Sequence, residues 1–353
     1  MSNHLYNRRK YSNSDTKLMR RLIDDVYFVL GVNLPWLDGQ YDHDFGKNEV
    51  MEHDFRTYDD NEKKEHLDTY FKDISHMGAR VVKLWIFERF EGLQFDSAGK
   101  IKAIDEGLIE NIGDVLRVAE KYNLYLYLCL LDTWSTTVHA QQHLPKLKSM
   151  IAKEEVRKSY IDNALKQFVL DTRLKKDRVF AIDVMNEPEG MYNSIWRRDI
   201  EWTDVIKFVN ECSEAVHSAN IRASCGFQHY QTLLENKDEL KFLDFYDYHE
   251  YNDDGALLSC NNLGLDKPCI IGACGQKSER YDDKIYEHAV SRFLDNSWKN
   301  GYAGCLTWYY NYKGYDENDS SNRYSLIKSN GDWRRVCYAL VNFNKKHKRA
   351  MLS

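Results

Sequence analysis

The stretch "VFAIDVMNEPEG", residues 179–190, decides the fold of this 353-residue chain. Its unbroken apolar run is typical of a strand in a parallel sheet, where both faces are covered. Pro188 ends the run, because proline has no N–H to donate to a neighbouring strand. The stop leaves Asn186 and Glu187 at the carboxyl end of the predicted strand.

Seven further runs have the same apolar character and alternate with amphipathic helical segments. Helical patterns fall between most of them, and the link between the fifth and sixth runs is short, so we expect one helical turn or a degenerate helix there. Eight strands interleaved with helices predict a single (β/α)₈ barrel of the α/β class. A doubly wound open sheet is disfavoured, because no G-x-G-x-x-G follows the first strand. The further predicted strands are 26–33, 80–87, 124–131, 222–227, 242–251, 268–273 and 303–310.

One barrel domain is expected over residues 25–353, preceded by an N-terminal arm at residues 1–24. Only four prolines occur, which argues against a flexibly linked second domain. The start of the chain is polar and lacks the apolar segment of a signal peptide. No run approaches 18 apolar residues, so neither a membrane span nor a membrane partner is expected. These features predict a cytoplasmic protein.

Composition indicates which ligands the protein is expected to bind: it disfavours nucleic acids and metals and is compatible with sugars. The formal charge of -6 and the pI of about 6.1 disfavour nucleic-acid binding, which usually requires a basic face. Eight cysteines occur without CxxC or Cys/His spacing, so we expect reduced thiols and no metal site. The 24 tyrosines and 8 tryptophans suit a core, but they also suit a sugar-binding site, because aromatic rings stack on pyranose faces.

The catalytic residues of such a barrel lie at the carboxyl ends of its strands. Glu187 occupies this position on the fourth strand. A glutamate held against apolar walls has a raised pKa and can act as a general acid. The alternative is a surface turn that happens to contain Asn-Glu-Pro, and the place of this tripeptide on the fourth of eight strands disfavours that interpretation.

Several strand ends together resemble one known group of enzymes. "NEP" on strand four, "GVNLPWLDG" (31–39), "GARVVKLWIF" (78–87), "HEY" (249–251) and "GCLTWYY" (304–310) are similar to clan A glycoside hydrolases, most of all family 5 of cellulase and mannanase type. The resemblance spans nearly all of residues 26–340. It implies a retaining β-glycosidase acting on a β-linked oligosaccharide or glycoside, with no cofactor, because two carboxyl groups perform the chemistry. It makes Glu187 the acid/base and gives Asn186 a hydrogen bond to the sugar 2-hydroxyl.

The seventh strand departs from the family pattern. There the clan usually reads like "kPv-igEfG", with the glutamate as nucleophile, whereas this chain has "KPCIIGACG" at 267–275, which places Ala273 at the nucleophile position. Alanine cannot attack an anomeric carbon. Either Ala273 is an introduced change in a retaining β-glycosidase, which the otherwise intact site favours, or the protein is a natural non-catalytic carbohydrate-binding barrel. Glu250 is a poor substitute, because strand alternation points it to the opposite face from His249 and Tyr251. Glu88 and Asp132 could line the cleft, but neither lies on strand seven.

The resemblance assigns roles to four further residues. It places Tyr251 beside the nucleophile, His249 near the acid/base, and Trp308 beneath the sugar being cleaved; the alternative for all three is simple filling of the barrel mouth or core. The family usually has an arginine at Lys83, where it pairs with the nucleophile, so we expect Lys83 to lack its partner here and local rearrangement or water to compensate. Weaker candidates for substrate contact are Trp36, Trp134, His139, Gln228 and His229.

Overall fold

The computed structural model describes residues 28–37, 43–133, 137–191, 200–276, 282–311 and 324–351. The predicted N-terminal arm at residues 1–24 and Trp134 lie outside the described residues.

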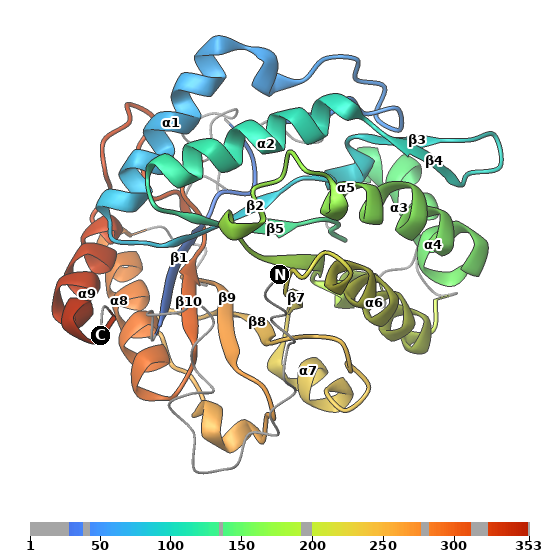
Figure 1. Cartoon of the computed structure of the whole chain (residues 1–353). Coiled ribbons are helices and arrows are strands. Elements are labelled where there is room, and N and C mark those ends of the chain that lie inside the picture. The colour runs from blue at the N-terminus through green and yellow to red at the C-terminus, as the bar shows by residue number, and fades with distance from the viewer. Residues whose placement is uncertain are drawn as a thin grey trace, which may run out of the picture.

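Eight parallel strands close into a barrel in the order β1-β10-β9-β8-β7-β6-β5-β2 (Figure 1). Each corresponds to one of the eight apolar runs, so the prediction of a (β/α)₈ barrel is confirmed. The runs carry few polar residues because helices cover the outside of the barrel and side chains fill its inside. The strands are β1 Val29–Asn33, β2 Val81–Trp85, β5 Tyr125–Cys129, β6 Val179–Asn186, β7 Ala223–Phe227, β8 Tyr246–Tyr251, β9 Cys269–Gly275 and β10 Gly304–Thr307.

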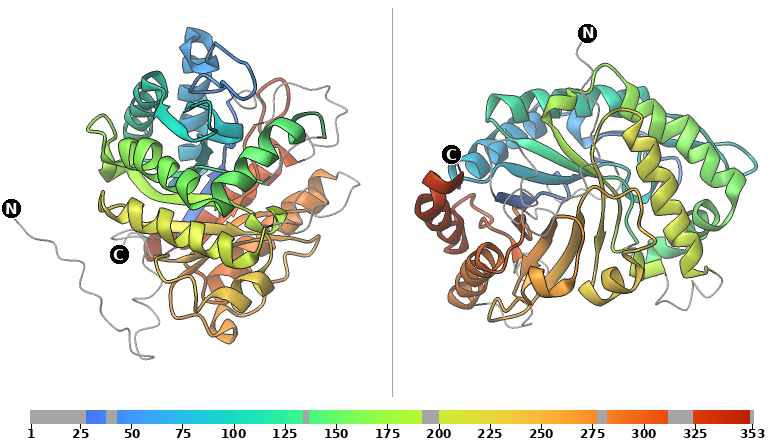
Figure 2. Two further views of the ribbon diagram at one scale, coloured as in Figure 1. Left: turned by 90° about the vertical axis from the view of Figure 1, so that its right-hand side faces the viewer. Right: turned by 60° about the horizontal axis from the view of Figure 1, so that its bottom comes forward.

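Helices surround the barrel on the outside, as Figures 1 and 2 show. Aspartates Asp60, Asp105 and Asp282 cap three of them by accepting hydrogen bonds from backbone N–H groups of the first turn. The short link between β7 and β8 holds only α7, as predicted. No helix in the described ranges combines the length and apolar character needed to cross a membrane. The helices are α1 Asn61–His76, α2 Glu106–Lys121, α3 Thr137–Ala152, α4 Glu154–Tyr160, α5 Lys166–Leu170, α6 Trp202–His217, α7 Tyr230–Asn236, α8 Asp283–Lys299 and α9 Val336–Met351.

One element was not predicted. A small antiparallel hairpin, β3 Leu93–Phe95 with β4 Ile101–Ile104, is inserted between β2 and α2. Its turn is held by Asp96, whose carboxylate accepts hydrogen bonds from the backbone N–H groups of Ala98 and Lys100. The strands are too short for a clear alternating pattern, so the sequence gives little signal for them.

The barrel interior changes character along the strands. Side chains alternate between the two faces of a strand, so Val81, Lys83 and Trp85 of β2 all point inward at successive levels. The lowest level is an apolar cluster, the middle level carries the charge of Lys83, and Trp85 joins an aromatic cluster at the carboxyl ends. The apolar cluster consists of Val29, Val81, Tyr127, Phe180, Ala181, Phe245, Ile270, Ala303 and Leu306.

Asn33 joins three strands at the carboxyl end of the barrel. It ends β1 and is almost fully buried. Its Nδ2 donates to the backbone oxygens of Gly272 on β9, at 3.0 Å, and of Thr307 on β10, at 3.3 Å. The amide therefore links β1 both to its neighbour β10 and to β9, the strand beyond β10.

Asn33→Ala should lower the free energy of unfolding by about 2 kcal/mol, because it leaves buried carbonyl groups without their donor. Asn210 is a suitable control, since its Nδ2 also donates to a backbone oxygen, that of Glu239, but near solvent. Asn210→Ala should cost less than about 1 kcal/mol. Urea unfolding of both variants measures the difference, and equal losses would contradict this role of Asn33.

Candidate active site

Glu187 lies directly after the last residue of β6, in an unusual backbone conformation. Its φ is 47°, a left-handed value that is uncommon for a non-glycine residue. Its N–H donates to the Gly226 oxygen at 2.6 Å, and its own oxygen accepts from Thr133 Oγ1 at 2.7 Å. Pro188 then begins a short 3₁₀ helix, Pro188–Met191. The neighbouring strands therefore hold the backbone that aims this carboxylate.

The carboxylate of Glu187 pairs with His249 of β8. The distance from Glu187 Oε1 to His249 Nδ1 is 2.7 Å, and the two side chains are 26% and 3% exposed. Burial acts to raise the pKa of Glu187, but the hydrogen bond and charge of His249, with the charges of Lys83 and His229, outweigh it and lower that pKa. The prediction of a raised pKa is therefore wrong for this chain, because the sequence pattern suggested apolar walls where cations and a hydrogen-bond donor lie.

Glu187→Gln should change how stability depends on pH. The pKa of Glu187 is lower in the folded chain than in the unfolded chain, where it is about 4.3, so ionisation stabilises the fold above that pH. This contribution is lost as the pH falls through the folded pKa. The difference in unfolding free energy between the unmodified chain and Glu187→Gln should be largest near neutral pH and shrink below about pH 4. Urea unfolding across this range tests it; a constant difference would contradict the pairing.

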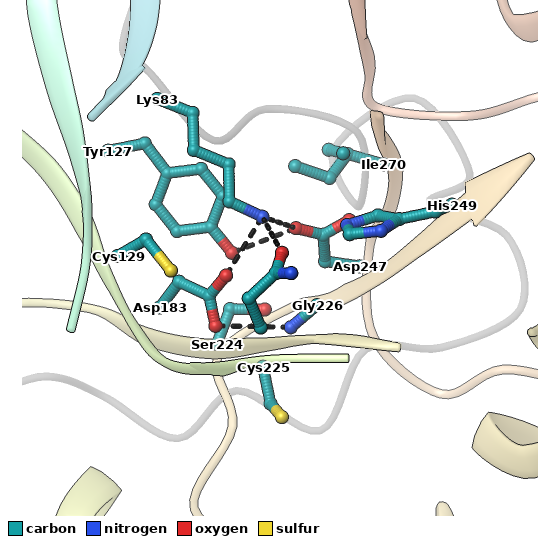
Figure 3. A network of polar contacts seen from close by, with 12 residues as sticks. Lys83, Tyr127, Cys129, Asp183, Ser224, Cys225, Gly226, Asp247, His249 and Ile270 are labelled. Atoms are coloured by element: carbon teal, nitrogen blue, oxygen red, sulfur yellow. Dashed lines mark hydrogen bonds and ion pairs between the residues drawn. The ribbon is translucent and has the colours of Figure 1, made fainter. Parts of the chain in front are cut away.

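A buried ion network lies beneath this pair (Figure 3). Lys83 Nζ is 2.8 Å from Asp183 Oδ2 and 3.5 Å from Asp247 Oδ2, and none of the three side chains is more than 1% exposed. The Tyr127 hydroxyl donates to Asp247 Oδ2 at 3.0 Å, and Lys83 Nζ donates to Asn186 Oδ1 at 3.5 Å. Burial acts to lower the pKa of Lys83, but the two carboxylates raise it, so Lys83 is an ammonium ion.

The expectation that Lys83 lacks a partner is therefore wrong. Its counterions are Asp183 on β6 and Asp247 on β8, which sequence reasoning missed. A signal was available, because a charged residue in an apolar strand requires a charged partner on a facing strand. Asp183 and Asp247 are the acids inside two other apolar strands, β6 and β8, at positions that alternation turns inward.

Ala273 lies on β9 and is 1% exposed. It pairs in register with His249 across the β8–β9 ladder, where the register shifts between Tyr248 and His249. Residue 273 therefore stands on the strand beside the histidine that holds Glu187. The preceding residue, Gly272, has no room for a side chain, because a Cβ there would lie 1.9 Å from Asp247 Oδ1.

Among the residues that the structure describes, no acid in this region takes over the position at 273. Asp247 is fully buried, and its Oδ2 is occupied by Lys83 and Tyr127. Glu250 Oε1 accepts a hydrogen bond from Asn252 Nδ2 at 3.3 Å, beyond the histidine along β8. Glu88 and Asp132 are buried at the ends of β2 and β5, and β9 itself carries no acidic residue.

Aromatic side chains gather at the carboxyl ends of β1, β2 and β10. The ring of Trp308 lies 6.1 Å from that of Trp36 and 5.9 Å from that of Trp85, with Tyr309 at 5.1 Å. Trp36 and Trp85 are each 5% exposed, whereas Trp308 is only partly buried. Trp308 can therefore offer a face to a ligand, and it packs on Trp36 and on Trp85, which sequence reasoning missed. The buried position of Trp36 leaves its predicted substrate contact untested.

The remaining predicted site residues lie in different surroundings. Tyr251 is close enough to Glu187 that burial first, and the charge of Glu187 second, raise its pKa. The backbone N–H groups of Gln228 and His229 donate to the two carboxylate oxygens of the buried Glu189, at 3.0 and 3.2 Å. Glu189 was missed by sequence reasoning and fixes the chain after β7. His139 belongs to α3 rather than to a loop, and its side chain is outside the described residues.

Gly272→Ala should destabilise the chain by about 1–3 kcal/mol, because the new methyl group would overlap the Asp247 carboxylate. Gly275→Ala is the matched control on the same strand, where a Cβ would meet Tyr251 Cε1 at an ordinary 3.4 Å. It should cost less than about 1 kcal/mol. Thermal and urea unfolding distinguish the two, and an unaffected Gly272→Ala would show that Asp247 lies elsewhere.

The chain is similar in sequence to proteins named as mannan endo-1,4-beta-mannosidases. No family model matches the chain. A "Mannan endo-1,4-beta-mannosidase" from Mytilus edulis is 24% identical over 330 residues, which cover 80% of this chain and 83% of the relative. Another of the same name from Cryptopygus antarcticus is 25% identical over 348 residues, covering 84% and 83%.

The fold has close counterparts among solved structures. The β-1,4-mannanase from the sea hare Aplysia kurodai superimposes with a TM-score of 0.66 at 20% identity, covering 92% of this chain and 95% of that one. At this identity the likeness establishes the shared (β/α)₈ fold and leaves the chemistry to the residues of the site.

Proposed function

We propose that the chain is a glycoside hydrolase barrel of family 5 type that binds a β-1,4-linked, mannose-containing glycan at the carboxyl ends of its strands. The observation that carries the proposal is the Glu187–His249 pair, set on strand ends beside the register position of residue 273. Two relatives named as mannan endo-1,4-beta-mannosidases support the choice of glycan.

Each residue then has a definite task. Glu187 is the acid/base, Asn186 binds the sugar 2-hydroxyl, and Trp308 stacks on the sugar ring. A retaining mechanism requires a second carboxyl group about 5–5.5 Å from the first to attack the anomeric carbon. Residue 273 is the position for that group, and the methyl group of alanine cannot form the glycosyl-enzyme bond.

The missing carboxylate also affects the first step. A general acid must be protonated when the substrate binds, yet the pKa of Glu187 is lowered in this chain. A second carboxylate nearby would raise that pKa, because two like charges disfavour each other's ionisation. Alanine at 273 therefore impairs both halves of the reaction, and the unmodified chain should bind glycan without cleaving it.

A natural non-catalytic carbohydrate-binding barrel is the second candidate. One observation favours it: the charge of Lys83 is already balanced by Asp183 and Asp247 while residue 273 is alanine. A site from which a carboxylate had simply been removed would be expected to leave a cation without its partner.

Ala273→Glu distinguishes the candidates. If the chain is an inactivated glycosidase, the variant should cleave an aryl β-mannoside or β-1,4-mannohexaose at least about a hundredfold faster than the unmodified chain, since loss of a nucleophile typically costs several powers of ten. The control is Ala273→Glu combined with Glu187→Gln, which should abolish the gained activity. Calorimetry should detect mannohexaose binding by the unmodified chain. Binding without gained activity supports the second candidate, and absence of both contradicts the proposed function.

A further inference from the structure

In the buried ion network, the charge of Lys83 is balanced by Asp183 and Asp247, with no contribution from residue 273. One ammonium, on Lys83, faces two carboxylates, on Asp183 and Asp247, and none of these three side chains is more than 1% exposed. The Tyr127 hydroxyl occupies the same oxygen of Asp247 that faces Lys83. The other oxygen, Oδ1, has no hydrogen-bond partner among the described residues. The network therefore already holds two carboxylates against one ammonium.

The network reaches the immediate neighbours of residue 273. Asp247 Oδ1 lies against Gly272, the residue before Ala273. Lys83 Nζ and His249 Nε2 are each 3.0 Å from the point that a Cβ on Gly226 would occupy, so the ammonium and the imidazole share one small region. His249 in turn pairs in register with Ala273. Figure 3 shows His249 and Asp247 on the same strand beside Lys83.

We infer that Asp247, rather than the side chain at 273, completes the counterion set of Lys83, so that this barrel is built around an uncharged residue 273. This inference rests on the proposed function, in which residue 273 is the nucleophile position. It adds that the pairing of Lys83 with Asp247 would limit the activity gained when a carboxylate is placed at 273. A carboxylate restored at 273 would enter a region where the ammonium of Lys83, the close one among the described residues, is already paired, and a buried charge without a partner is costly.

The test is a double-mutant cycle of stability between residues 247 and 273. Ala273→Glu alone should lower the thermal midpoint by about 5 °C or more, because it adds an unpaired charge. In the Asp247→Asn background the same change should lower the midpoint by less than half as much, because Lys83 is then available to the new carboxylate. The cycle isolates this coupling from the separate costs of each substitution.

Two controls separate charge from size and from general effects. Ala273→Gln adds the same bulk without charge, and Asp247→Asn should give it no relief. Asp266→Asn removes another aspartate that accepts a tyrosine hydroxyl, that of Tyr246, but at an exposed position. It should give no relief to Ala273→Glu. If Ala273→Glu does not fold, recovery of soluble protein by adding Asp247→Asn supports the inference, and continued failure to fold overturns it.

Additive midpoints in the cycle, or equal losses for Ala273→Glu and Ala273→Gln, would overturn the inference. Turnover provides an independent readout. On an aryl β-mannoside, Ala273→Glu with Asp247→Asn should be at least about tenfold faster than Ala273→Glu alone, which corresponds to roughly 1.4 kcal/mol. If the stability coupling is present but neither variant turns over, Asp247 remains the counterion of Lys83, and the inactivated-glycosidase candidate is the part that fails.

Discussion

A lysine ammonium inside a closed barrel is the constraint on which the site depends. Lys83 points inward from β2, where neither water nor the surface can balance its charge, so facing strands must supply carboxylates. Asp183 and Asp247 do so from β6 and β8. This requirement fixes the register in which three strands, far apart in sequence, present their middle level to one another.

The backbone around the ion network follows from the same constraint. Gly272 and Gly226 lie where a Cβ would press on charged or polar atoms: the Asp247 carboxylate at 272, and Lys83, His249 and Asp183 at 226. The backbone oxygen of Gly226 also accepts a hydrogen bond from the N–H of Glu187. Glu187 adopts its left-handed conformation one residue beyond the end of β6. The geometry of the partly exposed Glu187 and its buried partner His249 is thus supported by the packing of the buried charges.

The sequence predicts the fold well because apolar runs and proline stops are local signals. All eight strands follow from such runs, and the stop at Pro188 correctly places Glu187 at a strand end. The electrostatics of the site could not be predicted in the same way. Whether the pKa of Glu187 rises or falls depends on His249, Lys83 and His229, which come from three other parts of the chain. The counterions of Lys83 are likewise set by barrel closure rather than by neighbours in sequence.

The charge balance of the barrel links Glu187, the proposed acid/base, to Ala273. A retaining site works because two carboxylates share one region, so that one is ionised for attack and the other stays protonated. Here the acidic charge lies one level lower, on Asp183 and Asp247, where it neutralises Lys83 but is fully buried and cannot reach a substrate. Glu187, with a histidine partner and no acidic neighbour at 273, is free to ionise. Under the proposed function, such an ionised carboxylate would accept hydrogen bonds from sugar hydroxyls, which suits holding a glycan better than protonating its glycosidic oxygen.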